Sequence, residues 1–269
     1  MPTVAPDTRC RLSVEDMAGV SLAGGPAAAS VIDLATGDVL DVEAGEGGSF
    51  ELPCPSVPRL LRVSWLAGGA EVEAEVDVVA AHVCSLDDVR SWRADQYEVR
   101  ASDDELFSSR ARAVGVIEEE MGRALQPVMR LGVIDRPNCT GSPQMVMGEG
   151  GYADSLMYVV SARMGDGRPA SLPKRPGSAR LDVRALRVGE MAEVAYVCGM
   201  RTPPEARDAV RALASWYLTP RATPDNATST SSDVGTFSLV VAGVSGAETS
   251  LPEVNALIRR HGRAGGDVG

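Results

Sequence analysis

The last quarter of the chain joins two predicted helices through a connection that is too long and too polar for an ordinary loop. Start signals and apolar spacing predict helices at Thr202–Leu218 and Ser250–Arg260. The connection between them, Thr219–Thr249, is polar except for one alternating run, Thr236–Val241. Long connections inside compact domains are uncommon and are usually functional or disordered. We therefore expect this connection to become ordered on a neighbouring molecule. Such ordering points to an assembly protein rather than an enzyme.

The alternating run allows two interpretations. It places Phe237, Leu239 and Val241 on one side of an extended strand. The strand could be an internal edge strand, or it could add to the sheet of a partner through backbone hydrogen bonds. The preceding stretch, Ala222–Ser232, has the composition of a tether and no apolar pattern of its own. This composition favours addition to a partner.

Charge and composition exclude several classes of protein. The net charge of −11 is concentrated in residues 1–84, where 13 acidic and 4 basic residues give −9. Such a region repels DNA and anionic membranes. No apolar run is long enough to span a bilayer, and Met1–Val4 has neither the charge nor the apolar stretch of a secretory signal. We expect no contact with a membrane.

The residues that usually carry chemistry are sparse. The five cysteines are widely spaced without a C-x-x-C motif, which indicates a reducing compartment rather than a disulfide scaffold or zinc site. The two histidines, His82 and His261, stand far from each other and from every cysteine. No nucleophile elbow, Walker loop or dinucleotide fingerprint is present. We expect no enzyme activity, no cofactor and no metal, although a hydrolase whose site residues meet only in space stays open.

The N-terminal third shows the pattern of an all-β domain. Short alternating runs recur between residues 8 and 80 with glycine-rich turns between them, and we predict an acidic antiparallel β-sandwich over 1–84 with Trp65 in its core. The predicted strands are Cys10–Val14, Ala29–Leu34, Asp38–Val42, Gly48–Leu52, Leu60–Leu66 and Glu71–Val79.

The remainder indicates an α+β fold in which helices surround a small sheet. Capping-box patterns at Ser85, Ser102, Thr202 and Ser250 each precede a run with helical spacing. We predict a helical domain over 85–218 with an inserted β-sheet at 128–200, followed by an extended arm over 219–269 with a short strand and a terminal helix. The strands expected in the inserted sheet are Val128–Ile134, Ser155–Ser161, Ala179–Val183 and Met191–Cys198, with loops at 136–151 and 165–177.

A basic stretch at Arg163–Arg187 also has two interpretations. Arg168, Lys174 and Arg175 could lie on a loop that contacts DNA phosphates without sequence preference. An ordinary solvated loop is slightly favoured, because no aromatic residues interleave with the basic ones as they do in single-strand binders.

The order of these features resembles the head-to-tail adaptor, or connector, proteins of long-tailed phages, especially those that infect actinobacteria. The likeness covers about residues 8 to 262. It is carried by the strand-to-helix passage Val76–Arg90, by Val194–Met200 with the Pro-rich helix start after it, and by three C-terminal stretches. Those stretches are Pro224–Ser229, Asp233–Leu239 and Leu251–Ile258. Ala80-Ala81-His82 departs from the glycine and aromatic residue expected at this junction.

The resemblance implies a structural virion protein at the head-tail junction, assembled in the host cytoplasm. A homo-oligomeric ring of about twelve subunits would bind the portal protein, extend the DNA channel, and bind the next neck or tail protein, a stopper or tail terminator. In that family the C-terminal arm and last helix engage the portal or an adjacent subunit. Carried onto this chain, the resemblance implies an interface of Phe237, Leu239, Val241, Leu251, Val254, Leu257 and Ile258.

The main alternative is a β-sandwich module that binds a surface or a glycan. A secretory signal or an aromatic sugar platform would favour that reading, and neither is visible in the sequence.

Overall fold

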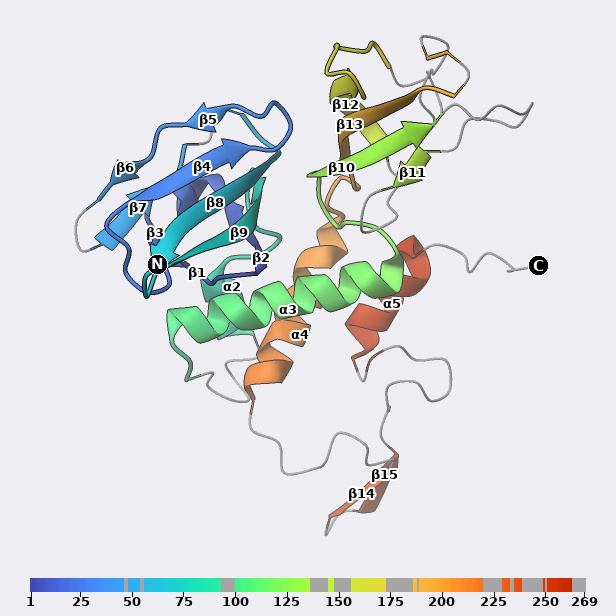
Figure 1. Cartoon of the computed structure of the whole chain (residues 1–269). Helices are drawn as coiled ribbons and strands as arrows, with labels where there is room; N and C mark the ends of the chain where they lie inside the picture. The colour runs from blue at the N-terminus through green and yellow to red at the C-terminus, as the bar shows by residue number, and fades with distance from the viewer. Residues whose placement is uncertain are drawn as a thin grey trace. The chain divides into compact units, whose positions relative to one another are not determined.

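The computed structural model divides into two compact units, which are interleaved along the chain (Figure 1). Unit 1 consists of Met1–His82 and Arg123–Arg201, and unit 2 consists of Val83–Gly122 and Thr202–Gly269. The structure describes residues 1–45, 48–53, 56–92, 100–135, 145–147, 156–172, 186–187, 189–219, 229–232, 235–238, 249 and 251–262. The mixture of helices and several sheets confirms the predicted α+β class.

The N-terminal part of unit 1 contains two sheets. One has the strand order β1-β3-β7-β6 and the other β2-β9-β8-β4-β5, and the short helix α1 (Val14–Met17) follows β2. The strands are β1 Thr3–Val4, β2 Arg9–Ser13, β3 Val20–Leu22, β4 Ala29–Asp33, β5 Val39–Leu40, β6 Glu43–Ala44, β7 Ser49–Glu51, β8 Arg59–Ala67 and β9 Ala70–Val79. The six strands predicted from alternation are therefore present. Trp65 is buried as expected and donates from Nε1 to the Ala23 carbonyl at 2.9 Å.

Strands β8 and β9 form a long hairpin, and the geometry of its turn accounts for glycine at two consecutive positions. The strands pair antiparallel from Arg59↔Val78 to Ala67↔Ala70. Gly68 and Gly69 connect them with φ of 61° and 86°, the left-handed values required at both central positions of a type I′ turn. Along β9 the exposed side of the alternation is limited to its first half, around Glu71 and Glu73, whereas Val76–Val79 are buried on both sides of the strand.

The prediction of a purely antiparallel arrangement is wrong at two pairings. β2 pairs parallel with β9, from Arg9↔Glu75 to Ser13↔Val79, and β1 pairs parallel with β3. Alternation and turn residues identify strands and hairpin neighbours. They carry no signal for the parallel pairing of strands that are not hairpin neighbours, such as β2 with β9 or β1 with β3.

The second part of unit 1 adds a third sheet with the order β11-β10-β13-β12. Its strands are β10 Val128–Asp135, β11 Met145–Met147, β12 Leu156–Met164 and β13 Met191–Cys198. Three of the four predicted strands are confirmed, and β11 appears where a loop was expected. The fourth predicted strand, Ala179–Val183, lies outside the described residues.

Two apolar clusters hold the third sheet within unit 1. The larger cluster joins one face of the sheet to Val79 of β9 and Ala124, and it includes the fully buried Tyr196. The smaller cluster joins Met129 and Ala195 of the third sheet to Ala35 and Leu60 of the first region. By contact, therefore, the third sheet belongs with the N-terminal strands. The division predicted from sequence, with boundaries after 84 and 218, remains a prediction.

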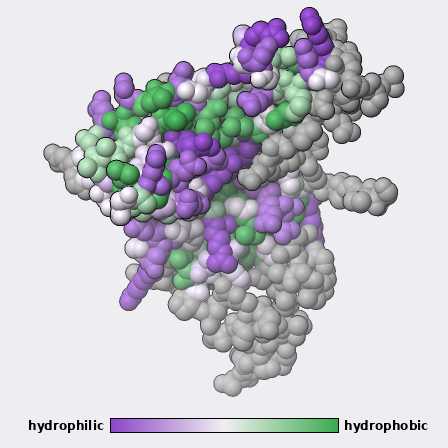
Figure 2. All heavy atoms as spheres, viewed as in Figure 1, coloured by the Kyte–Doolittle hydropathy of each residue, from purple (hydrophilic) through white to green (hydrophobic). Residues whose placement is uncertain are grey.

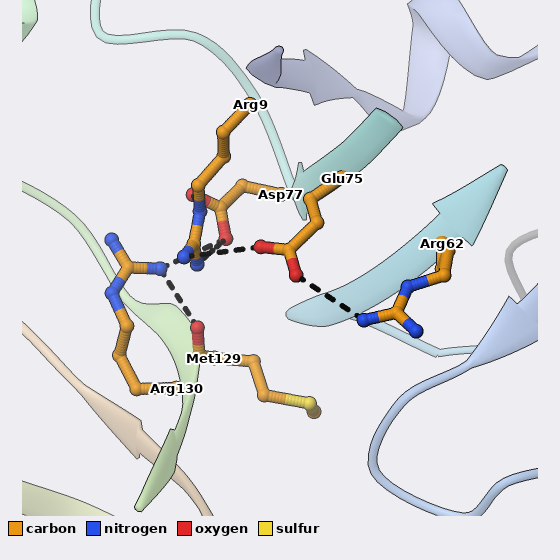
Figure 3. Close-up of polar contacts among 6 residues, drawn as sticks. All are labelled: Arg9, Arg62, Glu75, Asp77, Met129 and Arg130. Atoms are coloured by element: carbon orange, nitrogen blue, oxygen red, sulfur yellow. Dashed lines mark hydrogen bonds and ion pairs between the residues drawn. The ribbon is translucent and has the colours of Figure 1, made fainter. Parts of the chain in front are cut away.

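A buried carboxylate connects the same two regions of unit 1. Asp77 on β9 accepts hydrogen bonds from Arg9 Nε and Nη2 at 3.1 and 3.0 Å and from Arg130 Nη1 on β10 at 2.8 Å (Figure 3). Arg130 Nη1 also donates to the Met129 carbonyl at 2.8 Å. The side chains of Arg130 and Asp77 are only 9% and 6% exposed. Glu75 lies beside Arg9 and Arg62 at the more exposed end of this group.

Unit 2 is helical in the part that the structure describes, apart from one short hairpin. Its helices are α2 Leu86–Ser91, α3 Asp103–Met121, α4 Pro204–Leu218 and α5 Pro252–His261, and its strands are β14 Ser229–Ser232 and β15 Gly235–Ser238. α4 packs against α2, α3 and α5, and Arg207 of α4 donates to both Asp88 carboxylate oxygens, at 3.1 and 2.6 Å.

The predicted capping boxes are correct at Ser85 and Ser102 and wrong at Thr202, and the box predicted at Ser250 falls on a residue outside those that the structure describes. Ser85 and Ser102 each accept from the backbone of the third helical residue, whose carboxylate bonds back. α4 and α5 instead begin after Pro203 and Leu251 without a side-chain cap, because Pro204 and Pro252 occupy the first helical position. A box at Ser13, which heads α1, was not predicted because its helix is only one turn long.

Replacing Asp77 with Ala should destabilise unit 1 strongly. The change removes the carboxylate that Arg9 and the buried Arg130 share. Breaking a buried ion pair in this way lowers the free energy of unfolding by about 3–5 kcal/mol. Denaturant unfolding measures the loss. In the D77A/R130M double variant the loss should be smaller than the sum of the two single losses, because both changes disrupt the same contact; an additive result would contradict the coupling.

The two kinds of helix start should respond differently to mutation. Ser102→Ala removes a cap that accepts from the backbone N–H of Glu105, and should cost about 1 kcal/mol of unfolding free energy. Thr202→Ala is the matched control and should change stability by only about 0.5 kcal/mol or less, because Thr202 does not cap α4. Equal losses in thermal unfolding would contradict the observed caps.

Candidate partner-binding sites

The connection between α4 and α5 carries a small hairpin that pairs with itself. β14 and β15 run antiparallel with the register Ser229↔Ser238, Thr230↔Phe237, Ser231↔Thr236 and Ser232↔Gly235. Among the described elements, each of these strands packs substantially only against the other. An isolated two-stranded hairpin is marginally stable in water. It is therefore the element of the described chain that most needs further contacts.

Both ends of this connection are fixed to unit 2. At its start, Thr219 donates through its hydroxyl and its backbone N–H to the Ser215 carbonyl, at 2.8 and 3.0 Å. At its end, Asn255 of α5 accepts from the Thr249 backbone N–H at 2.8 Å and donates to the Thr249 carbonyl at 2.7 Å. The hairpin is therefore held at two points rather than carried on a free tail.

Stacked arginines reinforce the helices that carry the first of these attachments. The Arg112 guanidinium of α3 lies 4.1 Å from the centroid of the Tyr217 ring on α4, and the Arg211 guanidinium of α4 lies 4.3 Å from that of Trp92. Such cation–π contacts contribute about 0.5–1 kcal/mol each at exposed sites. The base of the connection is therefore firmly attached to its helices.

The structure separates the predicted interface residues into three groups. Phe237 lies on β15, opposite Thr230. Leu239 and Val241 lie outside the described residues. Leu251 stands at the N-cap of α5 and is partly buried, whereas Val254, Leu257 and Ile258 are 0%, 1% and 6% exposed.

The burial of α5 changes the interpretation of its apolar residues. α5 packs against α3 and α4 of the same unit, so its apolar face is covered by the chain itself. Val254, Leu257 and Ile258 are therefore buried without any contribution from a second polypeptide. Sequence spacing identified an apolar helix face correctly, but it could not say which surface covers that face. Whether a partner also contacts α5 remains a prediction.

The basic stretch is described only in part. Arg168 donates from Nε to Asp166 Oδ2 at 2.5 Å, and this hydrogen bond raises the pKa of the guanidinium above its ordinary value. Its charge is therefore partly balanced within its own turn. Lys174 and Arg175 lie outside the described residues. Contact with DNA remains a prediction.

The third sheet of unit 1 has a partly open face with a hollow that sequence reasoning did not identify. The hollow has a volume of about 430 Å³, and its floor includes Leu131 and Val133 of β10, Ser161 and Arg163 of β12, and Glu193 of β13. The register pairs Glu193 with both Val133 and Arg163, so these three side chains share one face. Alternation in the sequence marks the strands but does not show which part of a face stays uncovered.

One wall of the hollow is the turn after β4, formed by residues 34–36. Leu34 and Ala35 line it, and the Ser161 hydroxyl donates to the Ala35 carbonyl at 2.7 Å. The Arg163 guanidinium donates to the Thr36 carbonyl. Two polar side chains of β12 thus fix the wall, while the remaining lining is mainly apolar. Figure 2 shows apolar patches interspersed with polar residues on the face that it draws.

Cys10 and Cys84 have raised pKa values, and each histidine contacts a carboxylate. Burial raises the pKa of the Cys84 thiol to about 11 and that of Cys10 to about 12, which keeps both protonated and poorly nucleophilic near neutral pH. His82 Nε2 lies 2.5 Å from Asp16 Oδ2, and His261 Nε2 lies 3.2 Å from Glu205 Oε1. Each histidine is thus engaged in a local structural contact.

Comparisons with known proteins leave the family open. No protein-family model matches the chain, and no curated protein matches it. Among the described residues no group of three or more histidine, cysteine or acidic side chains could hold a metal ion. The described helices also include none that is long and apolar enough to cross a membrane.

The contact between Asp16 and His82 predicts a specific acid sensitivity. Burial opposes ionisation of Asp16, but hydrogen bonds from His82 and Ser13 outweigh it and lower the pKa to about 2, from an ordinary 3.8. Asp16 therefore contributes stability that is present above about pH 3.8 and is lost as the pH falls through about 2.

The unfolding free energies of wild type and Asp16→Asn should differ by about 1 kcal/mol near pH 5, after allowance for solvent screening at this partly exposed site, and should converge near pH 2. Unfolding free energies measured across this range test the sign. A difference that stays constant with pH would contradict the assignment.

Proposed function

We propose that the chain is a structural assembly protein, and specifically a head-to-tail adaptor of a long-tailed phage. In this proposal, copies of the chain form a ring beneath the portal protein, extend the DNA channel and bind the next neck or tail protein. The protein acts in the virion and has no catalytic role. The N-terminal sheets of unit 1 form the predicted β-sandwich and face outward as a brace.

The observation that carries the proposal is the hairpin β14–β15. It interrupts a helical unit between two well-anchored helices, and in the described chain its substantial packing is limited to its own two strands. A hairpin of this size gains stability by adding to a larger sheet, where backbone hydrogen bonds supply affinity.

The sequence order of the elements also supports the proposal. A β region leads into a capped helix, a strand and Gly199 lead into a second helix with proline at its start, and a connection with a strand precedes a terminal helix. Gly199 has a φ of 120°, and a Cβ at this position would collide with the Gln126 carbonyl oxygen. The strand–glycine–helix succession named in the resemblance therefore has a steric basis in this chain.

The packing of α5 decides which variant can test the proposal. Truncation at Thr219 would remove α5 and expose the apolar surfaces of α3 and α4, so any loss of assembly would be ambiguous. Replacing residues 229–238 with a Gly-Ser sequence of the same length removes both strands and leaves the anchors at Thr219 and Thr249 in place.

We expect the Gly-Ser variant to fold with an unchanged melting temperature and to fail to join particles that contain the portal. Negative-stain images of such particles, with and without the variant, measure incorporation. The matched control, Val254→Asp, should instead lose the fold of unit 2, because Val254 is fully buried. Incorporation of the Gly-Ser variant at the level of wild type would refute the role assigned to the hairpin.

A further inference from the structure

Unit 1 carries an exposed apolar projection in addition to the hollow described above. The projection, here called the knob, is the tip of the β8–β9 hairpin, Leu66–Glu71. Leu66 is 62% exposed, and Ala67, Gly68, Gly69 and Ala70 follow it without a charged side chain. The register places Glu71 directly opposite Leu66, so a carboxylate lies beside the leucine on the same face.

The hollow, here called the groove, offers complementary chemistry. It is lined by the apolar side chains of Leu34, Leu131 and Val133, and Leu131 remains 37% exposed. Arg163, whose guanidinium also donates to the Thr36 carbonyl, supplies one cation to the lining, and its register neighbour Glu193 supplies one anion. A leucine with an adjacent carboxylate can therefore place its apolar side chain on the floor and its charge near Arg163.

The knob and the groove belong to the same compact unit, yet the knob is exposed there. A copy of the chain therefore does not fill its own groove with its own knob. We propose that the knob of one copy docks into the groove of a second copy. Because two unlike surfaces meet, the contact is heterologous, and successive copies generate a ring when the rotation closes.

This inference rests on the proposed function and adds one subunit interface to it. The hairpin β14–β15 and the knob are separate elements on different units, so each can be altered without the other. Leu66 and Glu71 provide the apolar and charged parts of the contact. Glu193 opposes the contact, because it is the register neighbour of Arg163 in the groove and its negative charge repels that of Glu71.

Two variants of the full-length chain test the contact directly. Leu66→Asp disables the knob and leaves the groove intact, whereas Leu131→Asp disables the groove and leaves the knob intact. Each alone should remain monomeric at concentrations where wild type associates, because loss of one buried leucine contact weakens association about tenfold or more. Val14→Asp, at a position 43% exposed on α1, is the control and should associate like wild type.

Mixing the two variants gives the decisive result. A mixture still contains one intact knob and one intact groove, so native mass spectrometry should show heterodimers and no larger species. Glu193→Gln should tighten wild-type association by up to about fivefold, in keeping with an exposed ion pair. Circular dichroism confirms that each variant is folded.

Several outcomes would overturn the proposal. These are association of either single variant like wild type, a mixture that stays monomeric, or a wild-type chain that stays monomeric up to millimolar concentration. If Leu66→Asp still enters portal-bound rings and the Gly-Ser hairpin variant does not, this interface is refuted while the adaptor function stands.

Discussion

The carboxylate of Asp77 is the constraint on which unit 1 depends. It lies on β9, which is the strand that pairs with both β2 and β8, and it receives Arg9 from β2 and Arg130 from the third sheet. One buried anion therefore ties together segments that are 68 and 53 residues away from it in the chain. Burying a charge is costly unless it is well paired. The cost is met only when both regions are in place, which favours their folding as one unit.

Much of the local structure could be predicted from the sequence, because local signals determine it. Alternation marked the six N-terminal strands, and the boxes at Ser85 and Ser102 marked two helix starts. The signal failed at Thr202, because α4 begins at Pro204 with Pro203 at its N-cap, so Thr202 stands outside the capping position. Parallel pairing and the placement of the third sheet could not be predicted, since both depend on contacts between distant segments.

The candidate sites show the same difference between local patterns, which the sequence reveals, and contacts between distant segments, which it does not. Apolar spacing on α5 was identified correctly, yet Val254, Leu257 and Ile258 are covered by the chain's own helices. Conversely, no exposure was predicted for Leu66 or Leu131. Alternation from the buried Trp65 places Leu66 on the opposite face of β8, but the exposed fraction of Leu131 is known only from the structure. An apolar residue indicates that something covers it, but only the tertiary structure shows whether the same molecule already does.

The double attachment of the connection at Thr219 and Thr249 has a consequence for recognition. A segment held at both ends presents no free chain terminus. In the proposed assembly, a partner would therefore have to bind the hairpin from its side and not by admitting a chain end. Fixing both ends also removes conformations that a dangling tail would sample, so less entropy remains to be lost on docking.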